Sequence, residues 1–323
     1  MDIYAAFAAL QIEPSRQNLC AAVAVTEQES TFTVNPAVPN LGKAALAEID
    51  HRAEQHGIPA LLVHAALLLK SANGQSYAER IAAARTEQDL SRIYEELIGK
   101  VPLGQRLFAN GNPVRTAGPM QVNIAFAEEQ VRARSYPYPM GDSLRHELFT
   151  RRGGMYFGIA HLLGYSAPYD RPLYRFADFN AGRYASRNAA FQAAVSEASG
   201  IPLVLDGDLV SHDSGADDKP GSTELAVRSI GAKLELSDAE IRRAIDQDER
   251  AEFEQTEVYR RVFALADRLH GSRLPRALVP QITLKSPKIT RKLTTQWYAN
   301  RVDERYQACM IKASASAPKA AAR

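Results

Sequence analysis

The sequence lacks most of the features that would assign a protein class at once. Its 323 residues include only two cysteines, Cys20 and Cys309, which are too few for a disulfide framework or a cysteine-bound metal. One disulfide between them would need an oxidising compartment, and we expect both to be unpaired, with Cys20 buried in its apolar stretch. No apolar run reaches the ~20 residues of a membrane span; the longest, residues 58–69, contains His64 and predicts a core helix.

Strong net charge is also absent. The formal charge of +2 excludes a general polyanion-binding protein. This total hides an uneven distribution, because residues 272–323 carry +9 and the rest of the chain carries −7. The basic residues of this C-terminal part are Arg273, Arg276, Lys285, Lys288, Arg291, Lys292, Arg301, Arg305, Lys312, Lys319 and Arg323, against the acids Asp303 and Glu304. The chain is therefore a mildly acidic body with a basic end.

What the sequence contains is ordinary for a packed globular protein. Hydrophobic residues make up 46% and charged residues 24%, which excludes disordered and collagen-like chains. Apolar residues recur at helical spacing through most of the chain, so the sequence predicts a mainly α fold. The expected helices cover residues 2–10, 15–29, 42–70 with a break at Gly57 and Pro59, 76–99 with a second start at Thr86, the stretch from Pro119 to Val131, 142–164, a helix ending near Gly182, 188–198, 238–247, 251–270 and 287–312.

Local signals refine this pattern. Pro119 is expected in the first turn of its helix, where proline is tolerated. The glycines within 142–164, at positions 153, 154 and 158, predict close backbone packing. Residues 202–209, with Asp206-Gly207 at their centre, are the best strand-turn candidate. Ser237 and Glu240 form a capping box for the helix that follows them.

Glu29 and Ser30, at the end of an apolar helix, are the first candidates for chemistry. Desolvation disfavours the charged form of a carboxyl group, so the pKa of Glu29 is expected to rise, as a general acid at neutral pH requires. Taken alone, such a glutamate is most often a solvated helix end.

Two further motifs follow along the chain. Gly118-Pro119-Met120-Gln121 would present the Gln121 amide beside unpaired backbone N–H groups at a helix start, although a plain loop-to-helix junction has the same composition. Phe179-Asn180-Ala181-Gly182 has the composition of an ordinary helix C-terminus. Each motif alone has a structural explanation.

Together these motifs resemble the lysozyme-like catalytic domain of soluble lytic transglycosylases, which cleave peptidoglycan glycan strands. That family has Glu-Ser at a helix end, then Gly-Leu-Met-Gln, Gly-x-x-Tyr-Leu and Ala-Tyr-Asn-x-Gly. This sequence has the corresponding segments in the same order, with Gly158-Ile159-Ala160-His161-Leu162 as the third. The resemblance implies Glu29 as the catalytic acid and base, and Ser30, Met120, Gln121, Phe179 and Asn180 as glycan-binding residues.

The sequence departs from that family in two respects. His161 and Phe179 replace the two tyrosines of the pattern, and the second tyrosine lies close to the catalytic glutamate in the family. The segment between Glu29 and Gln121 is also much longer than usual, and we interpret residues 36–112 as a helical insertion. The expected domains are a lysozyme-like domain (1–205) with this insertion, a helical C-terminal extension (206–312) packed on it, and a flexible tail (313–323).

The whole chain also resembles YaiW-like outer-membrane lipoproteins of Gram-negative bacteria. The resemblance runs from Glu27-Gln28-Glu29-Ser30-Thr31-Phe32 to Lys288-Ile289-Thr290-Arg291-Lys292-Leu293-Thr294-Thr295. It implies the cell envelope or periplasm, with membrane association only through a lipid anchor that this chain does not contain. The N-terminus shows no signal peptide, so from the residues alone the chain is either cytoplasmic or an exported protein without its signal.

These resemblances imply two alternatives. The first is a metal-independent lytic transglycosylase that acts on peptidoglycan strands and needs no cofactor. The second is a catalytically degenerate envelope lipoprotein that binds peptidoglycan or assists peptide uptake. In either case we expect the basic end to lie near anionic stem peptides or lipids, and no nucleic-acid partner.

Other clusters have simpler explanations. Asp206, Asp208, His212 and Asp213 offer oxygen ligands for a cation, but their spacing fits no calcium loop and a solvated turn is expected. Trp297 and Tyr298 among basic residues resemble a stacking surface for single-stranded nucleic acid, and we instead expect Trp297 in the core. The remaining candidates, read as surface or core histidines, are His51, His56 and His64.

Overall fold

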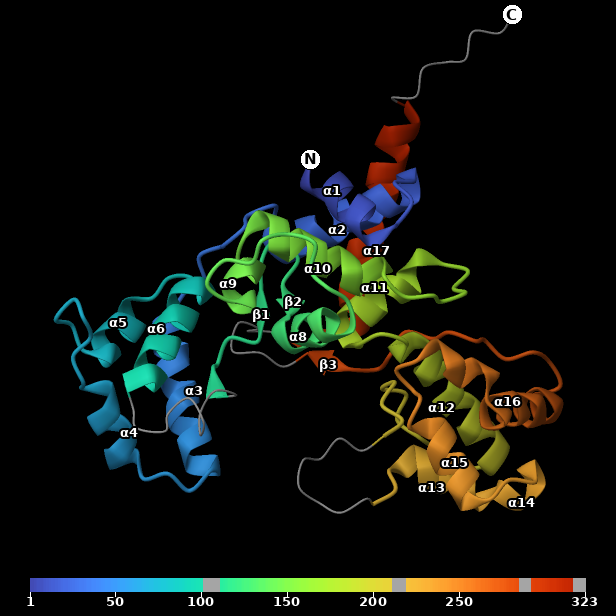
Figure 1. Cartoon of the computed structure of the whole chain (residues 1–323). Helices are drawn as coiled ribbons and strands as arrows, with labels where there is room; N and C mark the ends of the chain where they lie inside the picture. The colour runs from blue at the N-terminus through green and yellow to red at the C-terminus, as the bar shows by residue number, and fades with distance from the viewer. Residues whose placement is uncertain (101–110, 211–218, 285–291, 316–323) are drawn as a thin grey trace, which may run out of the picture. The chain divides into compact units, whose positions relative to one another are not determined.

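The computed structural model describes residues 1–100, 111–210, 219–284 and 292–315 (Figure 1). These ranges are mainly helical, as predicted, with two two-stranded antiparallel ladders. None of the helices in these ranges has the length and apolar character needed to cross a membrane. The chain forms two compact units: unit 1 comprises Met1–Glu13 and Thr26–Ile159, and unit 2 comprises Pro14–Val25 and Ala160–Arg323.

Unit 1 contains the N-terminal helix and the helices of the predicted insertion. Its elements are α1 (Asp2–Leu10), the last turns of α2 (Arg16–Ser30), α3 (Leu41–Gln55), α4 (Ala60–Leu67), α5 (Tyr77–Ala83), α6 (Glu87–Lys100), β1 (Thr116–Ala117), β2 (Val122–Asn123), α8 (Ile124–Ala133), α9 (Leu144–Leu148) and most of α10 (Arg151–Leu163). The predicted break at Gly57 and Pro59 separates α3 from α4. Thr86 accepts a hydrogen bond from the Asp89 backbone N–H and so begins α6.

Two predicted helix boundaries in unit 1 are wrong. Pro119 does not begin a helix, because it lies in the turn between β1 and β2; α8 begins only after Asn123, whose side chain accepts from the Ala125 N–H. The helix expected over 142–164 is broken between α9 and α10. At the break, the Thr150 hydroxyl donates to the Glu147 carbonyl and accepts from the Gly153 N–H, which gives α10 a new start.

Unit 2 contains the C-terminal helices and the first part of α2. Its other elements are α11 (Pro172–Ala181), α12 (Ala185–Ser199), α13 (Ser222–Ser229), α14 (Gly231–Leu234), α15 (Asp238–Ile245), the 3-10 helix η2 (Ala251–Gln255), α16 (Glu257–His270), β3 (Thr283–Leu284), β4 (Leu293–Thr294) and α17 (Thr295–Ala315). The capping box of Ser237 and Glu240 is confirmed at the start of α15. Helices α13 and α14 have no counterpart among the predicted helices.

The core of unit 2 lies around α12 and α16. Phe191 on α12 stacks on Tyr259 of α16, with ring centres 5.8 Å apart, and lies edge-on to Phe253 at 5.1 Å. All three rings are buried, so they contribute both burial and specific ring geometry. A second contact joins α11 to α17, where the rings of Phe176 and Tyr306 are 5.6 Å apart.

The strand-turn expected at 202–209 is absent. Side chains of α12 bind the backbone groups that a strand ladder would have used: Asn188 donates to the Gly207 carbonyl, and Gln192 accepts from the Gly207 N–H. Gly207 has φ +86°, and a Cβ atom there would lie 2.6 Å from the Ala185 carbonyl oxygen. The segment is therefore held as a loop against α12.

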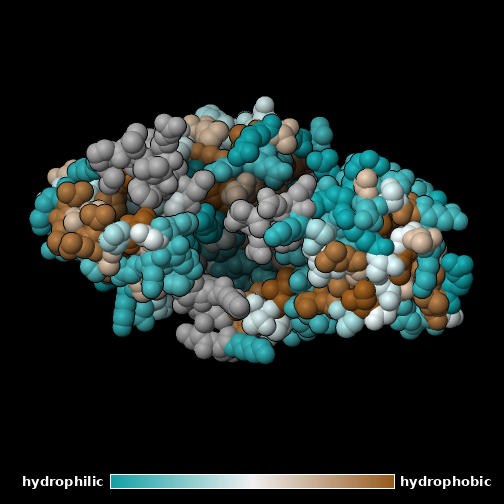
Figure 2. All heavy atoms as spheres, turned by 90° about the horizontal axis from the view of Figure 1, so that it is seen from below, coloured by the Kyte–Doolittle hydropathy of each residue, from teal (hydrophilic) through white to brown (hydrophobic). Residues whose placement is uncertain are grey.

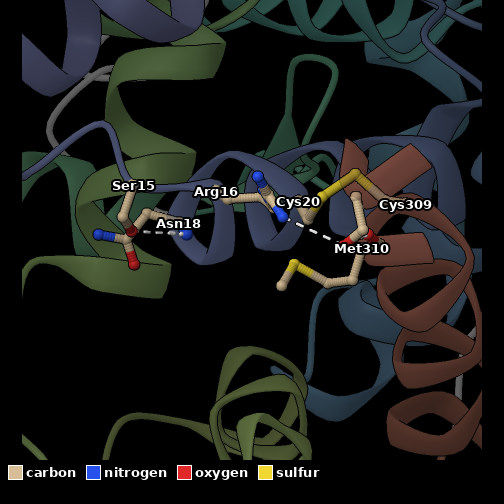
Figure 3. The surroundings of a disulfide bond; sticks show 7 residues. Ser15, Arg16, Asn18, Cys20, Cys309 and Met310 are labelled. Atoms are coloured by element: carbon tan, nitrogen blue, oxygen red, sulfur yellow. Dashed lines mark hydrogen bonds between the residues drawn. A yellow bond between two sulfur atoms is a disulfide. The ribbon is translucent and has the colours of Figure 1, made fainter. Parts of the chain in front are cut away.

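The prediction that the two cysteines are unpaired is wrong. Cys20 on α2 and Cys309 on α17 form a disulfide within unit 2, with their Cα atoms 5.6 Å apart (Figure 3). Cys20 is buried, as predicted. Arg16 also donates to the Ser314 hydroxyl at 3.1 Å, so the same two helices share a covalent and a polar contact. The bond is invisible to local sequence patterns because 289 residues separate its ends.

The last helix begins later than predicted. It starts at Thr295 rather than near residue 287, after the short strand β4; residues 285–291 lie outside the described ranges. The Thr294 hydroxyl accepts from the Trp297 N–H at 3.2 Å and caps the helix. Tyr298 is buried, whereas Trp297 is half-buried, so the predicted core position belongs to its neighbour.

Candidate functional site

The predicted catalytic residue, Glu29, lies in the last turn of α2. Its side chain is half-buried, and Ser30 ends the helix as a buried residue. Thr31 and Phe32 follow with φ values of +50° and +63°, so the chain leaves the helix through two left-handed residues. The predicted end of this helix is correct. The rise predicted for the pKa of Glu29 stays a prediction.

Ser30 connects this helix end to the second motif. Its hydroxyl donates to the Pro119 carbonyl at 2.7 Å and to the Thr26 carbonyl at 3.2 Å. The first of these bonds joins residues 89 positions apart in the sequence. Within unit 1, the structure therefore brings the Glu29-Ser30 helix end and the turn of residues 118–121 together.

The turn itself is held by close backbone contacts. Gly118 has φ +77°, and a Cβ atom there would lie 2.4 Å from the Leu148 carbonyl oxygen. Only glycine satisfies both constraints. Gln121 is half-buried with φ +48°; its amide donates to the Gly118 carbonyl and its oxygen accepts from the Thr116 hydroxyl, each at 3.1 Å. The Gln121 side chain is thus oriented by the turn that carries it.

Met120 packs between this turn and helix α10. It is fully buried, and its side chain fills the space over Gly158 on α10, where a Cβ atom would lie 2.5 Å from both Cβ and Sδ of Met120. The predicted close packing of the α10 glycines is confirmed here. Within unit 1, the first two motifs therefore meet Gly158, the first residue of the third motif, whose residues from Ala160 onward belong to unit 2.

The fourth motif belongs to unit 2. Phe179 is buried and packs against His161, with ring centres 5.0 Å apart, and the ring of His161 lies 3.2 Å from the Phe179 carbonyl oxygen. Burial, together with the nearby positive Arg183, lowers the pKa of His161 to about 4. Asn180 accepts a hydrogen bond from the Thr295 hydroxyl at 2.9 Å, so its side-chain oxygen contacts α17. The glycan contacts predicted for Phe179 and Asn180 stay predictions.

The other predicted clusters are structural or lie outside the described residues. Among the residues that the structure describes, no three His, Cys, Asp or Glu side chains are arranged to hold a metal ion. Asp206 accepts from Gln192, and His212 and Asp213 fall in a segment that is not described. The three histidines considered from the sequence, His51, His56 and His64, are exposed, and His64 pairs with Asp50 at 3.1 Å.

The basic end is only partly described. Arg276 makes two hydrogen bonds to Asp267, and Arg301 pairs with Glu304 at 2.7 Å. The charges of these arginines are therefore partly compensated within unit 2. Five of the basic residues lie outside the described ranges: Lys285, Lys288, Arg291, Lys319 and Arg323.

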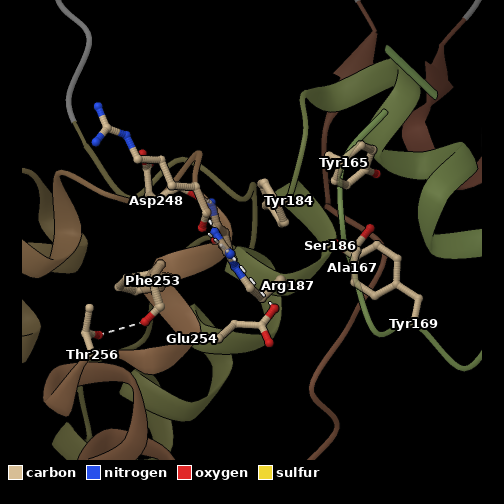
Figure 4. A network of polar contacts seen from close by, with 12 residues as sticks. Tyr165, Ala167, Tyr169, Tyr184, Ser186, Arg187, Asp248, Phe253, Glu254 and Thr256 are labelled. Atoms are coloured by element: carbon tan, nitrogen blue, oxygen red, sulfur yellow. Dashed lines mark hydrogen bonds and ion pairs between the residues drawn. The ribbon is translucent and has the colours of Figure 1, made fainter. Parts of the chain in front are cut away.

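Sequence reasoning missed a buried polar network in unit 2 (Figure 4). Asp178, next to Phe179, is 1% exposed and accepts from the hydroxyls of Tyr165 and Tyr169 at 2.9 and 2.7 Å, and from the N–H groups of Tyr184 and Ser186. Burial raises the pKa of Asp178, and also those of both tyrosines. The carboxylate therefore orders the entry into α12.

Arg187, in the first turn of α12, is also 1% exposed. Its guanidinium donates to the backbone carbonyls of Asp248 and Arg250 and lies over the Tyr184 ring, 4.2 Å from the ring centre. Glu254 is the nearest acid, at 3.9 Å. The signal that could have found this network is a charged residue inside an otherwise apolar helix pattern, at Asp178 and again at Arg187.

Comparisons with known proteins place the chain in a family. A family model described as "Protein of unknown function (DUF1615)" matches residues 1–312, and the chain belongs to this family. A curated relative, "Uncharacterized protein YaiW" of Escherichia coli (strain K12), is 54% identical over 309 residues, which cover 96% of this chain and 84% of the relative. The resemblance to YaiW-like proteins is thus confirmed. No solved structure matches the chain.

Proposed function

We propose that the protein is a peptidoglycan lytic transglycosylase of the cell envelope, with Glu29 as its general acid and base. The observation that carries this proposal is the hydrogen bond from the Ser30 hydroxyl to the Pro119 carbonyl. It ties the helix end that bears Glu29 to the turn that bears Gln121. The lysozyme-like fold is part of the same proposal, because it derives from the four motifs.

The chemistry needs one carboxyl group. Glu29 in its acid form donates a proton to the glycosidic oxygen while the bond from that oxygen to C1 of the muramic acid breaks. The resulting carboxylate takes a proton from the 6-hydroxyl of the same sugar, whose oxygen bonds to C1. The product is a 1,6-anhydro sugar, and Glu29 returns to its acid form. Hydrolysis would instead use two carboxylates.

The disulfide supports the envelope location. Disulfides persist in oxidising compartments, of which the bacterial periplasm is one. The bond between Cys20 and Cys309 lies inside unit 2 and joins helices from opposite ends of the chain. A periplasmic or outer-membrane protein would keep it, whereas cytosolic reductants would open it.

The second candidate function is a peptidoglycan-binding module without catalysis. Two observations in unit 2 favour it: Phe179 offers no hydroxyl, and the Asn180 oxygen is bound to Thr295. In this alternative the fold retains affinity for the glycan strand while turnover is lost.

Incubation with purified sacculi, followed by mass spectrometry of the released products, tests both candidates. The transglycosylase predicts anhydromuropeptides from the wild type and from Glu27→Gln, a matched change on the same helix, but none from Glu29→Gln. If all three proteins release nothing yet sediment with sacculi, the enzyme proposal is wrong and the binding module stands. If none sediments, both candidates are wrong.

A further inference from the structure

Helix α4 and the two residues that follow it expose a group of large apolar side chains. Leu61, Leu62, Leu68 and Leu69, on α4 and the two residues after it, are 79, 61, 67 and 45% exposed. Among the described residues, no other stretch of nine residues contains more than two exposed large hydrophobic side chains. Figure 2 shows hydrophobic residues gathered on the surface over the helices α3 to α6. We call these four leucines the α4 stripe.

The attachment of α4 explains the direction of the stripe. Leu67 is buried, and Val63 and Ala66 are half-buried, so one side of the helix packs against unit 1. At 100° per residue, Leu61, Leu62 and the C-cap residue Leu68 fall on the opposite side, over an arc of about 120°, and Leu69 follows them directly. The stripe therefore points outward, away from the core that could have covered it.

Charged residues are absent from the stripe itself and lie at its C-terminal end and on its flank. From residue 59 to residue 69 the sequence contains no Asp, Glu, Lys or Arg. At the C-terminal end, Lys70 and Lys100 are exposed and adjacent, because the Lys100 ammonium donates to the Lys70 carbonyl at 3.1 Å. Glu79 lies 3.7 Å from the Lys70 ammonium. On the flank of α4, His64 pairs with Asp50 of α3.

We propose that the α4 stripe docks into the interfacial region of a lipid bilayer. Leucines would enter the acyl boundary while the Lys70 and Lys100 ammoniums meet the phosphates of the headgroups, which is the charge complementarity of interfacial helices. A stable protein partner needs about 800 Å² from each side. Four leucines on two helical turns offer less than that, whereas each leucine that enters a bilayer contributes independently.

This contact is distinct from a lipid anchor and does not depend on Glu29. A direct contact between the α4 stripe and the bilayer would orient unit 1 relative to the membrane. A lipid anchor would only tether the protein to it. The proposal therefore departs from the earlier expectation that membrane association occurs only through an anchor.

The test uses the 323-residue chain without lipid modification and vesicles of phosphatidylethanolamine and phosphatidylglycerol. Leu61→Ser/Leu68→Ser is expected to lower the fraction that sediments with vesicles about tenfold or more, since two leucines lose their transfer into the bilayer. The matched control is Leu225→Ser/Leu269→Ser, which changes two leucines of unit 2 that are 53 and 58% exposed. It should sediment like the wild type. Equal losses in both double variants would overturn the proposal.

A second measurement reports depth and does not depend on the serine variants. In a Trp297→Phe background, Leu62→Trp places one fluorophore on the stripe. Lipids brominated on the acyl chains should quench its emission if the stripe enters the bilayer. A blue shift that depends on protein concentration and not on vesicles would show self-association instead and overturn the proposal, as would an emission that neither vesicles nor concentration change.

Discussion

The two units hold their motif residues in different ways. In unit 1, Gly118, Met120 and Gly158 are fixed by close contacts in which even one added carbon collides. In unit 2, Asp178 and Arg187 are themselves buried and are fixed by hydrogen bonds, among them bonds to the buried residues Ser186 and Asp248. We therefore expect the stability of the region around Glu29 to be sensitive to changes in side-chain volume. The stability of the region around Asn180 should be sensitive to the loss of buried charges.

The largest expected effect is the loss of the buried charge in unit 2. Arg187→Ala leaves the carbonyls of Asp248 and Arg250 without their donor and Glu254 without its nearest cation. Breaking such a buried arrangement costs about 3–5 kcal/mol of unfolding free energy. Denaturant unfolding measures it. The control is Arg260→Ala, an exposed arginine paired with Glu257, which should remain close to wild type. A wild-type midpoint for Arg187→Ala would contradict the role given to the network.

The disulfide gives the next largest effect, again in unit 2. Cys20→Ser/Cys309→Ser opens a loop of 289 residues. A disulfide typically contributes about 2–4 kcal/mol, chiefly by restricting the unfolded chain. Unfolding of the wild type in the presence of dithiothreitol should match the double variant, whose own stability should not respond to the reductant. If dithiothreitol reduces the disulfide, as titration of the thiols would show, but leaves the stability of the wild type unchanged, the prediction is contradicted.

His161 makes the stability of unit 2 depend on pH. Its pKa falls from the ordinary 6.5 to about 4 in the folded protein, so between these values the unfolded chain binds the extra proton. Stability therefore rises with pH through this window, and acidification from pH 6.5 to 4 should remove about 3 kcal/mol.

His161→Phe should abolish that slope, and the measurement is the difference between the wild-type and variant stability curves over pH. The difference is needed because Asp178 also makes stability depend on pH. Its pKa is raised in the folded protein, so its contribution to stability falls as pH rises through that pKa, opposite to the contribution of His161. Parallel curves for the two proteins would show that His161 does not titrate as described.

Most of the fold could be predicted because its helix ends are local. Ser15 caps α2, Ser237 and Glu240 cap α15, and the sequence around Gly57 breaks two helices, all through contacts within a few residues. The failures are long-range. The Pro202–Leu209 segment is a loop because α12 side chains bind its backbone, and the disulfide joins helices that no local pattern relates.

In the candidate site, too, the local features could be predicted from the sequence and the long-range contacts could not. The helix end at Glu29 and the tight turn at Gly118 follow from residue types, whereas the bond between Ser30 and Pro119 required the fold. Arg187 escaped notice because its carbonyl partners lie 61 and 63 residues away in the sequence. The partners of Asp178 are nearer, at 6 to 13 residues, but they lie in the segments before and after its helix. A charged residue within an apolar helical run should therefore be treated as a sign of a buried network.

The smallest expected effect tests the volume rule in unit 1. Gly158→Ala puts a methyl group 2.5 Å from Met120, so the methionine or the turn must shift, and we expect a loss of about 1–3 kcal/mol despite the higher helix propensity of alanine. Gly99→Ala is the matched control: it also lies in a helix but has nothing within 4 Å of the new atom, so propensity alone should stabilise it by about 0.5–1 kcal/mol. Removing the opposing side chain with Met120→Gly, which also deletes the Cβ atom at 2.5 Å, should make the Gly158→Ala change less costly than it is in the wild type, because the two residues share one space. If the two costs simply add in the double variant, the contact between the turn and α10 does not limit volume, and the contrast between the two units loses its basis.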